Sequence, residues 1–319
     1  MLSSINSLVV DSGMHVTKLQ GHVFLIDLET GGLENFIASY VLKGKKVAII
    51  EAGPTSSVPN LLQGLKKLGV KLEDVAYVAV SHIHLDHGGG VGTLLKHLPN
   101  AKIIVHHRGA THLANPEKLW RQSRMVLGKI TDLYGPPEPV PADRIVPATD
   151  GMVFDVGNNV RFRVVETLGH ASHHQSYFEN LGGAIFPGDA AGIYLKQFDA
   201  VVPTTPAPFR LENALSSLDT LAALKPKALY YSHFGPATNP MRKLQDYASQ
   251  LELWARIAAE GTKMGQSVEE IRERIINADA TIQKAAQLMR VHPILSETVL
   301  NNSVQGFIDF AEKSRAEKV

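Results

Sequence analysis

The order of apolar and polar positions divides the chain into two strand-rich parts and two helical parts. In the first hundred residues, short apolar runs alternate with polar turns, which is typical of strands, and the leucines between residues 61 and 68 follow helical spacing. A second set of strands is expected from residue 160 onward. The predicted strands cover residues 7–10, 22–27, 35–42, 46–51, 75–80, 102–105, 160–166, 184–186 and 228–231. Strands that cluster first and then alternate with helices favour an α/β protein with stacked sheets and helices outside.

Helical spacing dominates the two other parts. Residues 108–134 predict a helical insertion that packs on the sheets or forms a wall over a site, and the prolines that follow predict an extended surface strap over residues 135–147. From residue 239 onward, apolar residues recur at every third or fourth position. They are Leu244, Tyr247, Ala248, Leu251, Trp254, Ala258, Ile271, Ile275, Ile282, Met289, Val299, Val304 and Phe307. We expect a helical accessory extension over residues 239–319 that covers the mouth of a site or pairs two subunits; the insertion is the other candidate homodimer contact.

Composition narrows the class of protein. A chain of 319 residues is long enough for one main domain with a sizeable core and an accessory part. The formal net charge is +1 and long basic runs are missing, so no nucleic-acid partner is expected. The chain has no cysteine, which excludes disulfides, thiolate ligands and a cysteine nucleophile. Apolar runs of membrane-spanning length and a signal-type N-terminus are also missing, so we expect a cytoplasmic protein without a membrane partner.

The segment from Ser81 to Gly88 carries the strongest chemical signal. It places His82, His84, Asp86 and His87 within six residues, directly after the predicted strand 75–80. Because alternate residues of a strand face the same way, we expect His82 and His84 to bind one cation, while the following turn sends Asp86 and His87 toward a second position. A metal site is therefore predicted here.

Three more candidate ligands have the same placement. His170 follows the predicted strand 160–166, Asp189 follows 184–186, and His233 follows 228–231. Each lies at the end of an apolar run and at the start of a loop with glycine or polar residues. A rigid metal site requires ligands that are held on firm elements in this way.

An HxHxDH motif followed by a lone His, an Asp and a last His resembles the metallo-β-lactamase superfamily. The segment from Gly169 to Ser176 is similar to the GHxxGHQS pattern of its glyoxalase II-like and lactonase-like branch, with His173 in place of the Gly. The resemblance implies a metallo-β-lactamase αββα sandwich, with a catalytic domain over residues 1–238 that includes the 108–134 insertion, and a C-terminal helical extension. It implies that His174 and Ser176 support the ligand loop. It also implies two metal sites: His82, His84 and His170 for the first, Asp86, His87 and His233 for the second, and Asp189 bridging both.

The implied cofactors are two divalent transition metal ions, with zinc as first choice and iron, manganese or cobalt as alternatives, because imidazole and carboxylate suit all of them. Two cations can hold a hydroxide between them and polarise a carbonyl or phosphoryl oxygen. This predicts a binuclear hydrolase of a small acyl substrate (a carboxylic ester, lactone or thioester) with promiscuous phosphotriester activity. Asp86 is either a ligand only or also a catalytic group that holds the nucleophile and passes on a proton.

Two alternatives to a binuclear hydrolase stay open. Persulfide dioxygenase-like oxidoreductases use one iron and retain the same residues, and a non-catalytic metal-binding module is a third reading. An oxidoreductase would consume oxygen in the presence of a thiol substrate, whereas a hydrolase would not.

Tyr194 is a candidate substrate contact because it lies five residues after Asp189. Acyl-homoserine lactonases carry a substrate-binding tyrosine three residues after their bridging Asp, where this chain has Gly192. The other interpretation of Tyr194 is a half-buried wall residue. Residues 200–208 predict a stiff apolar loop beside the site, and for His106 and His107 we expect surface or packing roles.

Overall fold

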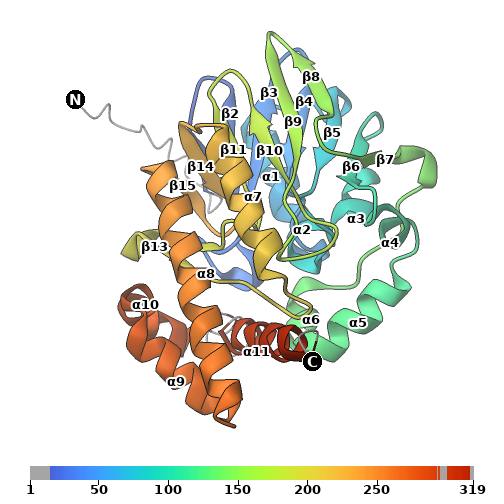
Figure 1. The fold of residues 1–319 in the computed structure, drawn as a ribbon. Coiled ribbons are helices and arrows are strands. Elements are labelled where there is room, and N and C mark those ends of the chain that lie inside the picture. The colour runs from blue at the N-terminus through green and yellow to red at the C-terminus, as the bar shows by residue number, and fades with distance from the viewer. Residues whose placement is uncertain (1–14, 293, 295–299, 317–319) are drawn as a thin grey trace.

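The computed structural model describes residues 15–292, 294 and 300–316, so the predicted strand 7–10 and Val299 lie outside the described residues, as does the side chain of Met289. Two β-sheets lie face to face, and helices cover their outer faces (Figure 1). This is the expected α/β sandwich with C-terminal helices.

The first sheet follows the order of the chain. It contains β1 (Val16–Lys18), β2 (Val23–Asp27), β3 (Ala38–Lys43), β4 (Val47–Ile50), β5 (Val75–Ala79), β6 (Lys102–His106) and β7 (Ile145–Ala148). Strands β1 to β4 are antiparallel, and β4 to β7 are parallel. The predicted surface strap is therefore wrong at its C-terminal end, where residues 145–147 belong to β7. Pro147 fits there because β7 is an edge strand, which can do without one ladder donor.

The second sheet has a different order. It runs β15 (Gly235–Ala237), β14 (Ala228–Tyr231), β11 (Ala184–Phe186), β10 (Gln175–Glu179), β9 (Val160–Glu166) and β8 (Val153–Gly157). Only β11 and β14 pair in parallel among these strands. A separate hairpin joins β12 (Ile193–Leu195) to β13 (Ala200–Val202).

Alternate residues of the central strands face two apolar layers. Tyr40 of β3 points between the sheets, where its ring meets Phe186 edge-on at 5.0 Å, and Val41 faces the helices. Both faces of these strands are covered, which explains why their sequences are almost continuously apolar.

Helices surround both sheets. They are α1 (Val58–Lys67), α2 (Leu85–Gly88), α3 (Val91–Leu95), α4 (Ala110–Ala114), α5 (Glu117–Leu127), α6 (Ile130–Tyr134), α7 (Leu211–Ala223), α8 (Pro240–Lys263), α9 (Val268–Ala278), α10 (Ala280–Val291) and α11 (Leu300–Ala316). Helix α1 matches the predicted leucine spacing, and its Gly64 allows close approach to the sheet, because a Cβ there would lie 2.6 Å from Ile26. The predicted insertion corresponds to α4, α5 and α6. Among the described residues, no helix has the length and apolar character needed to cross a membrane.

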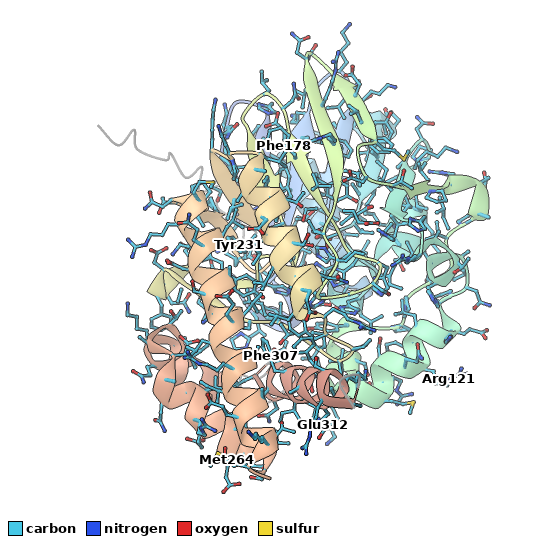
Figure 2. The ribbon with its side chains drawn as sticks, viewed as in Figure 1. Arg121, Phe178, Tyr231, Met264, Phe307 and Glu312 are labelled. Atoms are coloured by element: carbon cyan, nitrogen blue, oxygen red, sulfur yellow. The ribbon has the colours of Figure 1, made fainter. Side chains whose placement is uncertain are left out.

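The C-terminal helices pack on the rest of the molecule through buried side chains. Phe307 of α11 lies where this helix meets α8, and its ring contacts Phe209 at 4.8 Å (Figure 2). The ring of Trp254 in α8 also contacts Phe307, at 5.9 Å, and buried Asp279 accepts hydrogen bonds from Gln250 and Trp254, both at 2.7 Å. Because these donors and Asp279 lie in different elements, the bonds fix α8 relative to the start of α10.

Candidate metal centre

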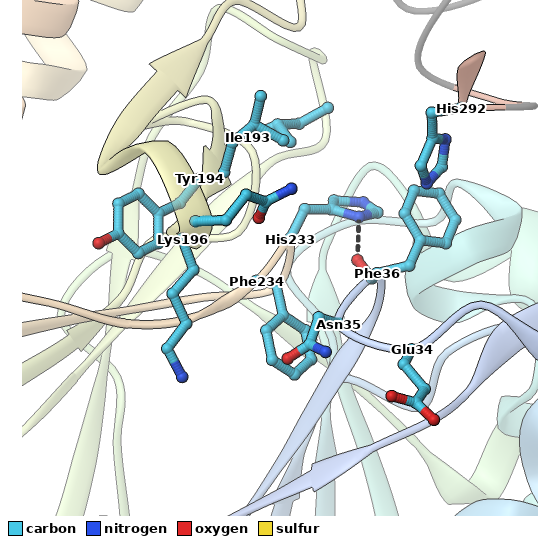
Figure 3. A pocket seen from close by; sticks show the side chains of 11 residues that line it. Glu34, Asn35, Phe36, Ile193, Tyr194, Lys196, His233, Phe234 and His292 are labelled. Carbon is cyan, nitrogen blue, oxygen red and sulfur yellow. Dashed lines mark hydrogen bonds between the residues drawn. The ribbon is translucent and has the colours of Figure 1, made fainter. Parts of the chain in front are cut away.

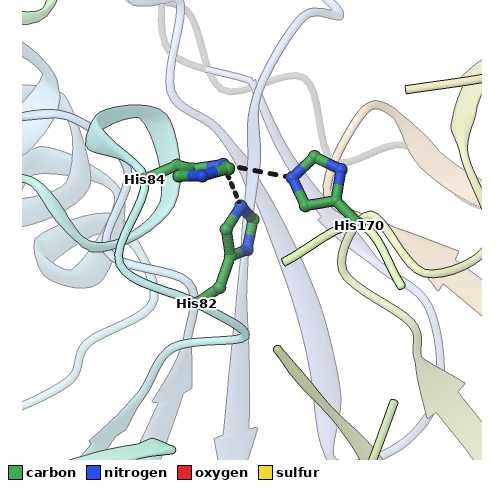
Figure 4. Close-up of side chains that lie close together, drawn as sticks. All are labelled: His82, His84 and His170. Atoms are coloured by element: carbon green, nitrogen blue, oxygen red, sulfur yellow. Dashed lines mark hydrogen bonds between the residues drawn. The ribbon is translucent and has the colours of Figure 1, made fainter. Parts of the chain in front are cut away.

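The first ligand group consists of three imidazoles (Figure 4). Nε2 of His82 lies 2.8 Å from Nδ1 of His84, which lies 3.1 Å from Nε2 of His170. Burial first, and the neighbouring imidazoles next, hold the pKa of His82 and of His84 well below the usual range. His82 and His84 are therefore neutral at pH 7, and a neutral imidazole is the form that binds a cation.

The backbone that presents this group differs from our expectation. Strand β5 ends at Ala79, so His82 and His84 lie in the loop between β5 and α2, and the prediction that they alternate on a strand is wrong. Where the chain leaves the first sheet, the Ser81 carbonyl accepts a hydrogen bond from Gln175 N at the start of β10, at 2.9 Å. A loop, rather than a strand end, brings the two rings together.

The second ligand group mixes carboxylate and imidazole. Oδ2 of Asp86 lies 3.4 Å from Nε2 of His233 and 3.8 Å from Nε2 of His87. Burial alone would lower the pKa of His87, but the carboxylates of Asp189, Glu51 and Asp86 raise it well above its usual range. Burial would likewise raise the pKa of Asp86, but His87 and His233 lower it well below the usual range. Without a cation, this group is held together by ion pairs.

Asp189 lies between the two groups. Its Oδ1 is 3.4 Å from Nε2 of His87, and its Oδ2 is 3.5 Å from Nε2 of His170. Gly188 makes this approach feasible, because it has φ 56° and a Cβ at this position would lie 2.5 Å from Ser81 Cβ. Within the described part of the chain, Nε2 of His87 and Oδ1 of Asp189 are buried without a hydrogen-bond partner. Cations between these groups would satisfy both atoms, so the ligand set fits two metal ions.

Backbone carbonyls orient one histidine of each group. Nδ1 of His170 donates to Thr204 O at 2.8 Å, and Nδ1 of His233 donates to Phe36 O, also at 2.8 Å. Each bond places a proton on Nδ1, so Nε2 is the atom of each ring that would bind a cation. The second bond is visible in Figure 3.

Glu51 is a supporting residue that our sequence analysis missed. One carboxylate oxygen lies 3.3 Å from Nδ1 of His87 and accepts from the Ser232 hydroxyl at 3.0 Å, and the other accepts from Ser81 N at 3.3 Å. Glu51 is 1% exposed and adopts φ 68°, which is rare for a residue other than glycine. The signal was present, because Glu51 follows an apolar run in the same way as Asp189.

His174 and Ser176 hold the loop of Asp189. His174 accepts from Asp189 N at 3.1 Å, so its Nδ1 carries the proton and donates to Thr167 Oγ1 at 2.9 Å. The hydroxyl of Thr167 then donates to Ser176 at 2.8 Å, and Ser176 donates to Pro187 O at 3.0 Å. This chain of bonds fixes the backbone on both sides of Gly188.

The C-terminal helices support one histidine of each group. In α11, Ser303 Oγ donates to Pro203 O at 3.0 Å and accepts from Thr205 N at 3.2 Å, which holds the backbone on both sides of Thr204. In α8, Lys243 binds Asp199 at 2.7 Å, and Asp199 accepts from the Tyr194 hydroxyl at 2.8 Å. The backbone of Tyr194 is hydrogen-bonded to His233 O and to Phe234 N.

Tyr194 therefore has a defined structural environment. It is 5% exposed, its ring stacks on Tyr231 at 5.2 Å, and its hydroxyl is bound to Asp199. In Figure 3 the ring points away from His233. A contact with substrate stays a prediction, and the hydroxyl would have to leave Asp199 to make it.

A pocket of about 650 Å³ opens beside His233 (Figure 3). Its apolar lining comes from Phe36, Ile193, Leu195 and Phe234. His292, just after α10, contributes to the wall, and its ring contacts Phe36 at 5.2 Å. A residue that directly follows the C-terminal helix α10 thus forms part of the pocket wall beside the second ligand group.

His106 and His107 lie in a separate cluster with Glu166. Nε2 of His106 donates to Glu166 at 2.9 Å while its Nδ1 accepts from Arg108 N at 3.2 Å, so both nitrogens of this buried ring are used. The ring of His107 stacks on His106 at 4.3 Å and is exposed. This environment agrees with packing and surface roles.

The geometry has clear counterparts among known proteins. The family model described as metallo-beta-lactamase superfamily matches residues 33–233. A metallo-beta-lactamase fold-containing protein of Sulfurisphaera tokodaii is 30% identical over 201 residues, 61% of this chain and 72% of the relative. An N-acyl homoserine lactonase of Azorhizobium caulinodans is 31% identical over 117 residues, 37% of this chain and 40% of the lactonase.

Solved structures agree with these sequence matches. An archaeal metallo-beta-lactamase superfamily protein from Sulfolobus tokodaii superposes with a TM-score of 0.59 at 28% identity, covering 68% of this chain and 80% of that one. A metallo-beta-lactamase family protein of Thermus thermophilus shares the fold, with a TM-score of 0.62 at 21% identity, covering 88% of this chain and 89% of that one. Because the family match spans more than half of the chain, the protein belongs to the metallo-beta-lactamase superfamily and is a hydrolase of that fold.

Proposed function

We propose that the protein is a binuclear metal-dependent hydrolase of carboxylic esters, lactones or thioesters. The observation that carries this proposal is Asp189, which turns one oxygen toward His87 and the other toward His170, at 3.4 and 3.5 Å. A carboxylate that serves two ligand groups suits two cations rather than one. When bound, such a pair supplies a water of lowered pKa and Lewis acidity for a carbonyl oxygen.

Asp86 has the placement of a proton carrier. Its side chain is 21% exposed, whereas that of Asp189 is 5% exposed, so Asp86 can be reached from the open side of the centre. Oδ2 is directed to His233 and His87, and the other oxygen is available to hold a proton in transit to a leaving group. This supports the catalytic role for Asp86 over a role as ligand only.

The pocket beside His233 supports a small acyl substrate. Aromatic and aliphatic side chains line it, and its volume is in the range of small-molecule sites. The lactonase similarity described above favours an ester or lactone bond as the target. Phosphotriesters are a secondary class, because the same Lewis acids serve a phosphoryl oxygen.

Metal analysis and substrate profiling test the proposal together. Protein reconstituted with zinc, manganese or cobalt should bind about two ions per chain and cleave aryl acetates, lactones or thioesters. A stoichiometry that stays at one or below would contradict the binuclear centre. Thiol-dependent oxygen uptake without hydrolysis of any of these substrates would instead favour the mononuclear iron oxidoreductase.

A further inference from the structure

Tyr134 is the last residue of α6, in the helical insertion, and the backbone on both sides of it is fixed. The Ser56 hydroxyl donates to Leu133 O at 2.6 Å, and the Thr55 hydroxyl lies 2.9 Å from Pro136 O. The Thr55 hydroxyl also donates to the backbone oxygen of Gly89 at 3.0 Å, and Gly89 lies one residue beyond α2. Helix α6 packs directly against α2, which carries Asp86 and His87. The insertion is therefore attached to the ligand-bearing helix at the point where Tyr134 lies.

The side chain of Tyr134 is largely buried, but its hydroxyl makes no hydrogen bond to the described residues. The residue is 3% exposed, and its hydroxyl has no hydrogen-bond partner among the described residues. Burial first, and the carboxylates of Asp86 and Asp189 next, raise the pKa of Tyr134 well above its usual range. The phenol therefore stays protonated at neutral pH and lies within electrostatic reach of both carboxylates. Because this unpartnered hydroxyl oxygen is not one of the fully buried atoms, solvent reaches it, and a ligand on this side of the centre can bind it.

We propose that the Tyr134 hydroxyl is a catalytic hydrogen-bond donor, which binds an oxygen of the acyl substrate and stabilises the negative charge that develops on it. The proton stays on the phenol throughout, so this role adds no bond-making step to the reaction. The inference rests on the proposed function for the class of substrate. It also gives the insertion a function, since α6, its last helix, then forms part of a wall of the reaction site.

Tyr134 and Tyr194 differ in what their hydroxyls already bind. The Tyr194 hydroxyl donates to Asp199, whereas that of Tyr134 is available without breaking a bond. Tyr230 offers a matched control outside the site, because it is a buried tyrosine between the sheets whose hydroxyl accepts from Gln20 at 2.9 Å.

The test compares wild type, Tyr134→Phe and Tyr230→Phe after metal reconstitution. Inorganic phosphate serves as a tetrahedral oxyanion probe, and its Kd is measured by isothermal titration calorimetry. We expect Tyr134→Phe to bind phosphate about tenfold more weakly or worse, with unchanged metal content and melting temperature, and Tyr230→Phe to bind it like wild type. On an aryl ester, kcat of Tyr134→Phe should fall roughly ten- to a hundredfold with little change in KM.

The outcomes separate this inference from the proposed function. Weaker phosphate binding in Tyr134→Phe supports the donor role even when no ester is cleaved, a result that would count against the hydrolase assignment alone. Equal phosphate affinity and equal ester turnover in wild type and Tyr134→Phe would overturn the donor role and leave the hydrolase assignment intact. Loss of metal in Tyr134→Phe would make Tyr134 structural. A wild type that binds no phosphate and cleaves no substrate would refute both proposals.

Discussion

The two ligand groups differ in what holds them together before a cation binds. In the group of His82, His84 and His170, all three members are imidazoles, and the pKa values of His82 and His84 lie well below the usual range, so a cation can bind these two rings without displacing an extra proton. In the group of Asp86, His87 and His233, opposite charges already compensate each other, and a cation must displace protons. We therefore expect the two cations to be unequal, with the second one the more easily lost.

Removal of Asp189 tests the link between the groups and has the largest expected effect. Asp189→Ala should lose the second cation and fall well below a tenth of wild-type turnover, because Asp189 faces both groups, while the sandwich core keeps the protein folded. Elemental analysis and ester hydrolysis are the measurements. Asp219→Ala, an exposed carboxylate on α7, is the control. Retained turnover above roughly a tenth would show that Asp189 does not bridge.

Glu51→Gln should weaken the second group selectively. Glu51 lies 3.3 Å from Nδ1 of His87, and loss of its charge should lower the affinity for the second cation roughly ten- to a hundredfold. Competition with a chromophoric chelator measures this affinity. Glu166→Gln is the matched control, because Glu166 also binds a buried histidine, His106, outside both groups. An equal affinity for the second cation in Glu51→Gln and Glu166→Gln would contradict a specific role for Glu51.

Each C-terminal helix should affect a different group. Ser303→Ala frees the loop that orients His170, and Lys243→Met frees the strand that is hydrogen-bonded to His233. We expect about three- to tenfold weaker binding of the first cation in Ser303→Ala and of the second in Lys243→Met. Lys243→Arg should restore part of the loss.

Arg242→Met serves as the control for these helix variants, because the Arg242 side chain is 79% exposed and forms a surface ion pair with Asp246 at 3.4 Å. The same loss in Arg242→Met would indicate a general effect on α8. A Ser303→Ala variant that loses the second cation instead would reverse the assignment of the helices to the groups.

The last prediction concerns a buried carboxylate outside both ligand groups, and its removal should affect the metal centre least. Asp27 is 2% exposed, and burial raises its pKa to about 6, whereas His87 and His233 lower that of Asp86. Because the folded pKa lies above the unfolded one, this group adds stability below about pH 4, and the contribution is lost as pH rises through 6. The unfolding free energy of wild type relative to Asp27→Asn should fall by about 2 kcal/mol across this range.

Denaturant unfolding of both proteins at several pH values measures this difference. A metal-dependent contribution is common to wild type and Asp27→Asn, so it cancels in the comparison. A difference that does not change between pH 4 and pH 7 would show that Asp27 is not perturbed.

The sequence by itself indicated the candidate ligand residues, which the structure brings together, and most of the main strands. His170, Asp189 and His233 each follow an apolar run, and these runs are β9, β11 and β14. Residues 22–27, 35–42, 46–51, 75–80 and 102–105 coincide with β2 to β6, except that β3 and β6 each extend one residue further. Such elements are readable because apolar periodicity is local and strong. Strands β12 and β15 were not predicted, and β15 begins with Gly235 and Pro236, which are typical of turns rather than of strands.

Only the tertiary structure decided which atoms orient the ligands. Glu51 meets Ser232 across 181 positions of sequence, and Ser303 meets Pro203 across 100. Tyr134 lies beside the ligand-bearing helix because α6 packs on α2, and the loop of His82 and His84 is fixed by a strand of the other sheet. These relations depend on how the layers pack, and the spacing of residues along the chain does not encode the distance between segments that meet only after folding.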